Sequence, residues 1–176
     1  MIAQEIAINY PERVIKLVLA STYAYQDHKS SGPTSEMNQV VQSSDKMGLV
    51  LVNLAFNKPL SKFWIALMVN IFSRFIKESE KAANKTGFEG QLDACSKHDT
   101  LERLPLIKAP TLVITGTADR VIRSTSSEAI AGKIPNSRLV KIENGSHVIN
   151  MEMRNIFNQQ VLSFFTDSRT NPALIN

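Results

Sequence analysis

One short run of residues, from Thr111 to Thr115, constrains the fold of this chain more than any other feature. The run is apolar and β-branched, reads T-L-V-I-T, and is closed by Gly116. A run without polar alternation is typical of a parallel strand that is buried on both faces. Such a strand needs a parallel neighbour, which is reached through a crossover that is usually a helix. We therefore expect an α/β fold with this strand inside the sheet.

The residues that follow supply both the crossover and the neighbour. A polar, Ser-rich segment with helical signals comes first, and Thr125 and Glu128 within it are spaced as a capping box. The segment from Arg138 to Ile142 then reads as a second strand. The order predicts two parallel strands that are joined by a helix.

An acid and a histidine come after these two strands. Asp119 lies in the loop that Gly116 opens, and His147 lies in the loop after Ile142. In open α/β sheets the loops at the carboxyl ends of the strands form the ligand-binding edge, so we expect both side chains at one edge as a candidate catalytic pair. Two plainer roles stay open. Asp119 could be a turn residue that binds its own backbone, and His147 could be an exposed loop residue after Gly145.

The N-terminal residues predict one more helix and one more strand. Ile2–Asn9 forms a short helical segment that ends before Pro11, a residue that does not fit inside a helix. Val14 to Ala20 is nearly all apolar, which predicts a buried strand that needs cover on both faces. We expect residues 1–24 and 105–176 to form the core of the fold, with a C-terminal amphipathic helix and a frayed tail from Thr166.

Between the two parts of this core, the hydrophobic pattern becomes helical. Residues 25–104 are predicted to form a helical cap, or lid, with helices over residues 40–56, 60–75 and 87–97. The middle helix carries apolar residues at steps of three and four: Leu60, Phe63, Trp64, Leu67, Met68, Ile71, Phe72 and Phe75. A stripe of this kind could line a pocket, but it more often packs into a core.

Composition excludes several classes of function. The net charge of +4 comes from scattered Lys and Arg without a basic stripe, so we expect no nucleic-acid partner. One cysteine, Cys95, and three histidines give no metal-ligand spacing, and we expect neither a metal nor another cofactor. No signal peptide is visible, and the longest apolar run, Phe63 to Val69, is too short to cross a membrane. We expect a cytoplasmic protein without a membrane partner.

The motifs together resemble the C-terminal part of the α/β-hydrolase superfamily. The matching segments read A-P-T-L-V-I-T-G before Asp119, G-S-H at His147, and Y-P-E-R-V and L-V-L in the N-terminal region. The resemblance implies a partial α/β-hydrolase fold with three parallel strands, flanking helices and a helical cap insertion. It also implies that Asp119 and His147 are the acid and histidine of a catalytic triad. The apolar cap favours a small apolar ester, lactone or related carbonyl compound as substrate.

The nucleophile of that family is the residue that this sequence lacks. Family members carry it in G-x-S-x-G, a strained strand-to-helix turn that would lie directly before Met1. No two glycines of the chain are four apart around Ser or Cys. We therefore expect a serine-type hydrolase portion without nucleophile or oxyanion hole, which gives no turnover on its own. The alternative is a catalytically inactive truncated fragment that acts as a dimeric or association module.

Other residues could replace parts of the triad, but each has a weakness. Ser21 and Ser124 lie near strand ends without a turn that would expose a nucleophile, and Ser146 is adjacent in sequence to His147. Cys95 is expected to be a buried thiol of the cap. For the acid, Asp27 lies several residues too far along the chain. The other two histidines, His28 and His98, have no acid or thiol at a telling spacing, and His98 with Asp99 fits a loop or cap role.

The strand from Val14 to Ala20 also predicts a partner. Without a neighbour on one side, it would leave a long apolar edge, which natural proteins avoid. We expect a homodimer in which this strand pairs antiparallel with its copy about a two-fold axis, so that two three-stranded sheets become one of six strands.

Overall fold

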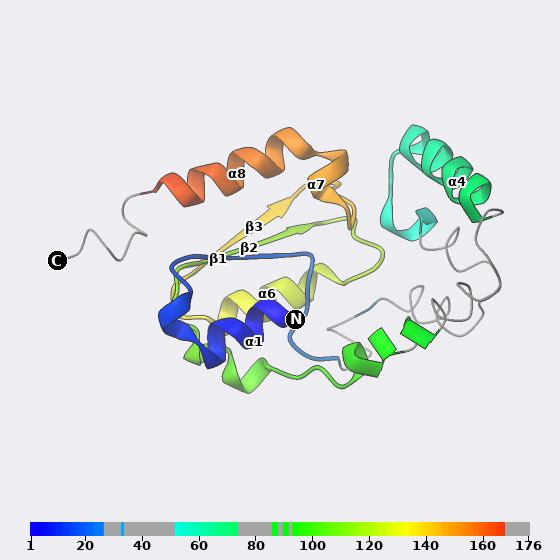
Figure 1. Cartoon of the computed structure of the whole chain (residues 1–176). Coiled ribbons are helices and arrows are strands. Elements are labelled where there is room, and N and C mark those ends of the chain that lie inside the picture. The colour runs from blue at the N-terminus through cyan, green and yellow to red at the C-terminus, as the bar shows by residue number, and fades with distance from the viewer. Residues whose placement is uncertain (27–32, 34–51, 74–85, 88–89, 92, 168–176) are drawn as a thin grey trace.

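The computed structural model describes residues 1–26, 33, 52–73, 86–87, 90–91 and 93–167 (Figure 1). Asp27 and His28 lie outside the described residues. So do most of the helix expected over residues 40–56, Phe75, and residues 168–176 of the tail.

A parallel sheet of three strands forms the centre of the described chain. Its strands are β1 (Leu17–Ala20), β2 (Thr111–Gly116) and β3 (Ser137–Ile142), in the order β1-β2-β3. Leu17 pairs with Thr111, which pairs with Ser137 on its other side. Every residue of the middle strand is buried, as its continuous apolar sequence predicts. The expected α/β fold with three parallel strands is confirmed.

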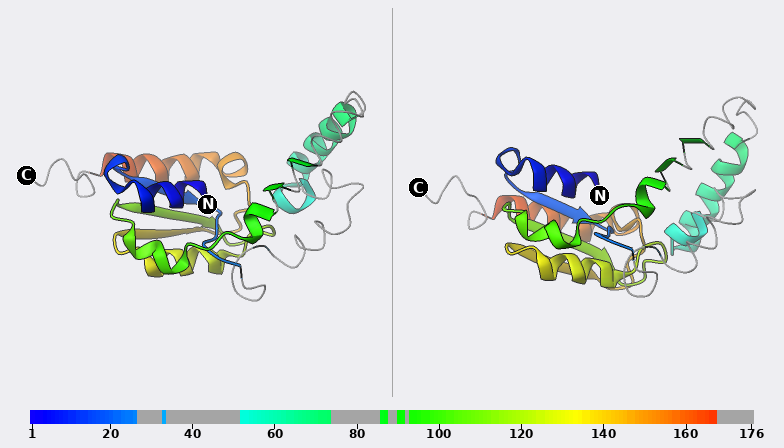
Figure 2. Two further views of the ribbon diagram at one scale, coloured as in Figure 1. Left: turned by 60° about the horizontal axis from the view of Figure 1, so that its bottom comes forward. Right: turned by 90° about the horizontal axis from the view of Figure 1, so that it is seen from below.

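Two layers of helices cover the sheet (Figures 1 and 2). On one face lie α1 (Ile2–Asn9), α6 (Ser124–Lys133) and the 3-10 helix η2 (Leu101–Leu106). On the other face lie α7 (Ile149–Glu152) and α8 (Arg154–Thr166). The middle strand alternates between them, because Val113 packs with the first layer while Leu112 and Ile114 pack with the second.

The first strand is shorter than the sequence pattern indicates. The prediction placed its start at Val14, but a 3-10 turn, Pro11–Arg13, holds that residue through a bond from Val14 N–H to the Pro11 carbonyl. Pairing begins only where Leu17 N–H donates to the Pro110 carbonyl at 2.9 Å. Apolar, β-branched composition continues through both conformations, so it could not show where the ladder starts.

The predicted capping box of the crossover helix is wrong. The N-cap of α6 is Arg123, no side-chain hydrogen bond caps the helix, and Thr125 lies inside the first turn. Glu128 instead pairs with Lys141 of β3 at 2.9 Å. The carboxylate of Glu128, which the capping-box motif assigned to the start of the helix, therefore pairs with a neighbouring strand instead.

The predicted helix with the apolar stripe is present as α4 (Pro59–Ser73). It lies apart from the two layers, on the side to which the carboxyl ends of the strands point (Figure 1). Its large side chains are open to solvent, with Leu60 70%, Phe63 60% and Trp64 56% exposed, so the preferred interpretation of the stripe as core is wrong. Among the described residues, no helix is both long and apolar enough to cross a membrane.

Candidate active site

Asp119 lies in the loop between β2 and α6, and its side chain is fully buried. The carboxylate divides its bonds between two tasks. Oδ1 accepts the backbone N–H groups of Val121 at 2.8 Å and Ile122 at 2.9 Å, while Oδ2 faces His147. Backbone donors thus fix one oxygen in the turn and leave the other free to orient a partner.

His147 lies in the loop after β3, and its Nδ1 is 2.9 Å from Asp119 Oδ2. The two predicted site residues are therefore brought together at one edge of the sheet. Because the aspartate accepts at Nδ1, the neutral ring carries its proton there and leaves the lone pair of Nε2 available. The side chain of His147 is 29% exposed, whereas that of Asp119 is fully buried. The imidazole therefore reaches solvent and the carboxylate does not.

Two glycines let the loops of Asp119 and His147 approach each other. A Cβ added to Gly116 would lie 2.1 Å from the carbonyl oxygen of Gly145, and one added to Gly145 would lie 2.9 Å from Cα of Gly116. The loops are joined further by bonds from Ala118 N–H to the Gly145 carbonyl and from Asn144 N–H to Thr117 Oγ1. Side chains at these two positions would push the acid away from the histidine.

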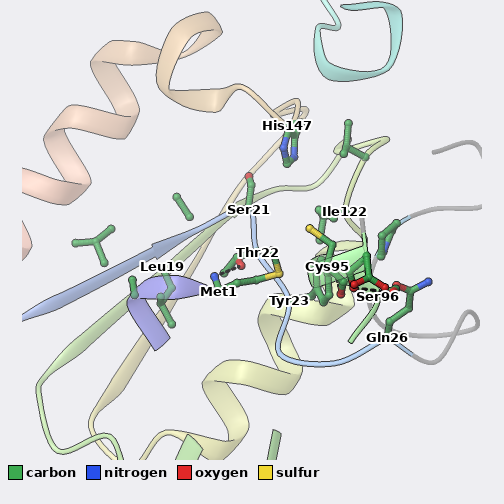
Figure 3. Close-up of a pocket in the computed structure, with 16 residues that line it drawn as sticks. Met1, Leu19, Ser21, Thr22, Tyr23, Gln26, Cys95, Ser96, Ile122 and His147 are labelled. Carbon is green, nitrogen blue, oxygen red and sulfur yellow. Dashed lines mark hydrogen bonds between the residues drawn. The ribbon is translucent and has the colours of Figure 1, made fainter. Parts of the chain in front are cut away.

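A cavity of about 700 Å³ opens beside His147 (Figure 3). Its walls are mostly apolar and come from β1, the segment after β1, the loop after Asp119 and the part of the chain near Cys95. The lining residues are Met1, Ala3, Val18, Leu19, Ala20, Ser21, Thr22, Tyr23, Gln26, Pro33, Asp93, Cys95, Ser96, Val121, Ile122 and His147. A site of this size and character suits a small, largely apolar molecule.

Ser21 differs from its sequence-based description. It follows β1 directly and has a φ of 44°, a left-handed conformation that is costly for a residue with a Cβ. Its Oγ is buried and has no hydrogen-bond partner. In Figure 3 this hydroxyl points toward the ring of His147. Sequence reasoning did not predict this left-handed conformation, and the hydroxyl that Ser21 carries is buried.

The other candidate residues lie elsewhere or have structural partners. Ser146 is buried, Ser124 begins α6, and neither lines the cavity. Cys95 lines the cavity but is only partly buried, and its carbonyl accepts the hydroxyl of Tyr23 at 2.9 Å. The ring of His98 contacts Gln4 Oε1 at 3.2 Å, which ties α1 to the segment before η2.

Glu152 is a residue that sequence reasoning did not single out. It lies on α7, shortly after His147, and its carboxylate accepts the backbone N–H groups of Asn57 and Lys58. Its partners are about a hundred positions away in the chain, so no local spacing could have revealed the contact.

The comparisons with known proteins place the chain in a family. The family model for the α/β hydrolase fold matches residues 1–153. A curated relative, named "Putative carbamate hydrolase RutD", of Azorhizobium caulinodans, is 25% identical over 93% of this chain and 62% of its own length.

Two solved structures have the same fold. A hydrolase from Pseudomonas aeruginosa PA01 superposes with a TM-score of 0.70 at 28% identity and covers 94% of this chain and 60% of its own. The enol-lactonase from Burkholderia xenovorans LB400 superposes with a TM-score of 0.69 at 21% identity, which shows the fold alone, and covers 94% and 61%. The chain thus spans about three fifths of these relatives. With three parallel strands, two helical layers and a match over residues 1–153, the chain belongs to the α/β hydrolase family.

Proposed function

We propose that Asp119 and His147 are the acid and the base of a serine-type hydrolase that acts on small apolar esters, lactones or related carbonyl compounds. The hydrogen bond from His147 Nδ1 to the buried Asp119 carboxylate carries this proposal. In acyl transfer, Nε2 takes the proton of an attacking hydroxyl and returns it to the leaving group. The aspartate holds the tautomer and stabilises the imidazolium.

The choice of substrate has two supports. The cavity beside His147 is mostly apolar, and the relatives include proteins named as a carbamate hydrolase and an enol-lactonase. Carbamates, lactones and esters share an acyl carbon that a hydroxyl can attack, followed by departure of an oxygen or nitrogen leaving group. The proposal therefore covers this shared chemistry and does not choose among its members.

We propose further that the attacking serine lies outside the 176 residues. The chain contains no G-x-S-x-G, and it spans about three fifths of the relatives that it matches. On this proposal, residues 1–176 alone give no turnover of p-nitrophenyl esters, because neither a nucleophile nor an oxyanion hole is in place.

The test begins with the DNA upstream of the codon for Met1, where we expect an in-frame G-x-S-x-G. The extended protein should hydrolyse short p-nitrophenyl esters. Asp119→Asn should lower kcat by roughly 10⁴-fold and His147→Ala by roughly 10⁶-fold, the losses typical of removing the acid and the base of a triad. As a control, His98→Gln should keep the activity, because His98 does not line the cavity.

One result would overturn the placement of the nucleophile. If residues 1–176 alone hydrolyse the esters and His147→Ala abolishes that activity, the nucleophile lies within the chain. Ser21 would then be tested first through Ser21→Ala, with Ser96→Ala as the control from the same cavity. If the extended protein hydrolyses the esters and His147→Ala leaves that activity unchanged, the acid–base proposal itself fails.

The second candidate function is an association module without catalysis. It is favoured by the position of β1 at an edge of the three-stranded sheet. Its test is the oligomeric state, measured by sedimentation velocity.

A further inference from the structure

Residues 52–58, here called the bridging segment, are bound at one end by a single carboxylate. Glu152 Oε1 accepts the N–H of Lys58 at 2.7 Å, and Oε2 accepts the N–H of Asn57 at 2.9 Å. The backbone carbonyl of Glu152 also accepts from Lys58 Nζ. Two backbone donors on one carboxylate form a charge-assisted pair that fixes direction as well as distance.

The bridging segment also contacts the loop that carries Asp119. Asn57 Nδ2 donates to the carbonyl of Ala118 at 3.1 Å, and Arg120 Nη1 donates to the carbonyl of Asn53 at 3.4 Å. Leu54 is buried in one cluster with Val121 and Ile122. The segment therefore touches the acid's loop and, through Glu152, the helix that follows the histidine's loop.

Electrostatics keeps the Glu152 carboxyl charged. Burial acts to raise its pKa, but the nearby Ser146 hydroxyl, the two N–H groups and the charge of Lys58 together outweigh burial and lower it. Because the pKa of Glu152 is lowered, its carboxylate stays charged at neutral pH, and its hydrogen bonds to Asn57 and Lys58 are present there. They are lost only as the pH falls through the lowered value.

We propose that Glu152 is a positioning residue, which fixes the bridging segment between the loop of Asp119 and the helix that follows the loop of His147, and so holds Asp119 against His147. The role of the pair rests on the proposed function, whereas the attachment of the segment does not. A segment that joins the loop of Asp119 to the helix after the loop of His147 restricts their relative motion, and a shift of about 1 Å at a catalytic pair is enough to lower a rate strongly.

The experiment compares Glu152→Gln with the unchanged chain by amide hydrogen exchange. Glutamine has one acceptor oxygen for two N–H donors, so we expect protection at Asn57 and Lys58 to fall at least tenfold. The 15N resonances of the His147 ring should change as well, because the pair loses its fixed geometry. Unaltered protection at both amides would overturn the proposal.

Two control variants separate this role from general loss of charge. Glu128→Gln removes a carboxylate from a surface pair with Lys141 and should leave the protection of Asn57 and Lys58 unchanged. Lys58→Met removes Nζ but keeps the backbone donor and should keep most of the protection. Equal losses in Glu128→Gln and Glu152→Gln would count against a specific role.

The pH profile of the unchanged chain gives a second measurement, which also decides the question if Glu152→Gln does not fold. Protection at Asn57 and Lys58 should be lost in acid, below the ordinary carboxyl range, while that of Val113 in β2 persists. Simultaneous loss at all three amides would overturn the proposal. None of these readings depends on turnover, so a failure here is distinct from a failure of the extended protein to hydrolyse esters.

Discussion

At the scale of single residues, Asp119 shows that two interpretations of one motif can both hold. Its Oδ1 binds the backbone of its own turn, as an ordinary turn aspartate does, and its Oδ2 binds His147. The turn is what aims the second oxygen. The backbone bonds of Oδ1 therefore orient Oδ2 toward His147, and the proposed catalytic role depends on that orientation.

We predict that Gly116→Ala separates the Asp119–His147 pair. The new methyl group would meet backbone atoms, with the Gly145 oxygen at 2.1 Å and the Ser146 oxygen at 2.8 Å, so one loop must move. Overpacking of this kind costs about 1–3 kcal/mol, and rigid backbone neighbours favour the upper end. Urea unfolding measures the free-energy change, and 15N NMR of His147 reports whether the pair survives.

The matched control for this prediction is Gly132→Ala. Gly132 lies in α6, and a Cβ there would meet nothing within 4 Å. Alanine in a helix should then raise stability by about 0.5–1 kcal/mol. Similar losses in both variants would show that the close approach of the two loops is not the cause.

The sequence predicted Asp119 and His147 as a pair because strand ends in a parallel sheet meet at one edge. It could not predict their supports. The contact of Gly116 with Gly145 and the bonds of Glu152 both depend on distances between segments far apart in the chain. Local spacing contains no information about such distances.

At the scale of elements, the C-terminus of α8 is capped by Lys16, a residue from the N-terminal part of the chain. Its last turn contains no basic residue, yet Lys16 Nζ donates to the carbonyls of Phe164, Phe165 and Asp167 at 3.0–3.1 Å. The last carbonyls of a helix have no N–H four residues further along within it, and a positive charge suits the negative end of the helix dipole. The segment just before β1 is thereby attached to the C-terminal helix.

We predict that Lys16→Met lowers the free energy of unfolding by about 1–2 kcal/mol, because the partly buried carbonyls lose a charged donor. Urea unfolding checks the value, and faster amide exchange should be confined to the last turn of α8. Lys133→Met is the control. It breaks a solvent-exposed pair with Glu102 and should cost no more than about 0.5 kcal/mol. A cost for Lys16→Met as small as that of the control would contradict the capping role.

The elements also show why periodicity predicted α4 but not its surroundings. Steps of three and four identify the helix, which the structure places at Pro59–Ser73. What packs against that helix is a property of tertiary structure. The rings of Phe63 and Trp64 pack edge to face with their centroids 5.5 Å apart, and both side chains remain largely exposed.

At the scale of the whole molecule, the fold class and the order of elements followed from the sequence, because buried parallel strands and amphipathic helices have distinct patterns. The division into a core of residues 1–24 and 105–176 and a cap of residues 25–104 remains a prediction. So do the cytoplasmic location and the homodimer. The parts that could not be predicted are those in which one segment sets the position of another, such as the bridging segment.

We propose that β1, an edge strand of the sheet within the described part of the chain, pairs with its copy in a homodimer. Sedimentation velocity at micromolar concentration should give the mass of two chains. Ile15 precedes this strand and is 66% exposed, so Ile15→Lys should shift the population toward monomer, since charge at an edge opposes strand pairing. Ile156→Lys, on α8, is the control and should leave the mass unchanged. A monomeric unchanged chain would contradict the proposal.

The pairing of Leu17 with Thr111 has a consequence for how such a protein can vary. The chain leaves the sheet after β1 and returns at β2, so everything between the two strands is a closed loop. The entropy of closing a loop rises only with the logarithm of its length, and doubling the length adds only about 0.6 kcal/mol. Insertions between Ala20 and Thr111 would therefore cost the sheet little, whereas one methyl group at Gly116 would cost more. The length between β1 and β2 can therefore change at little cost, while the Asp119–His147 pair stays under tight steric constraint.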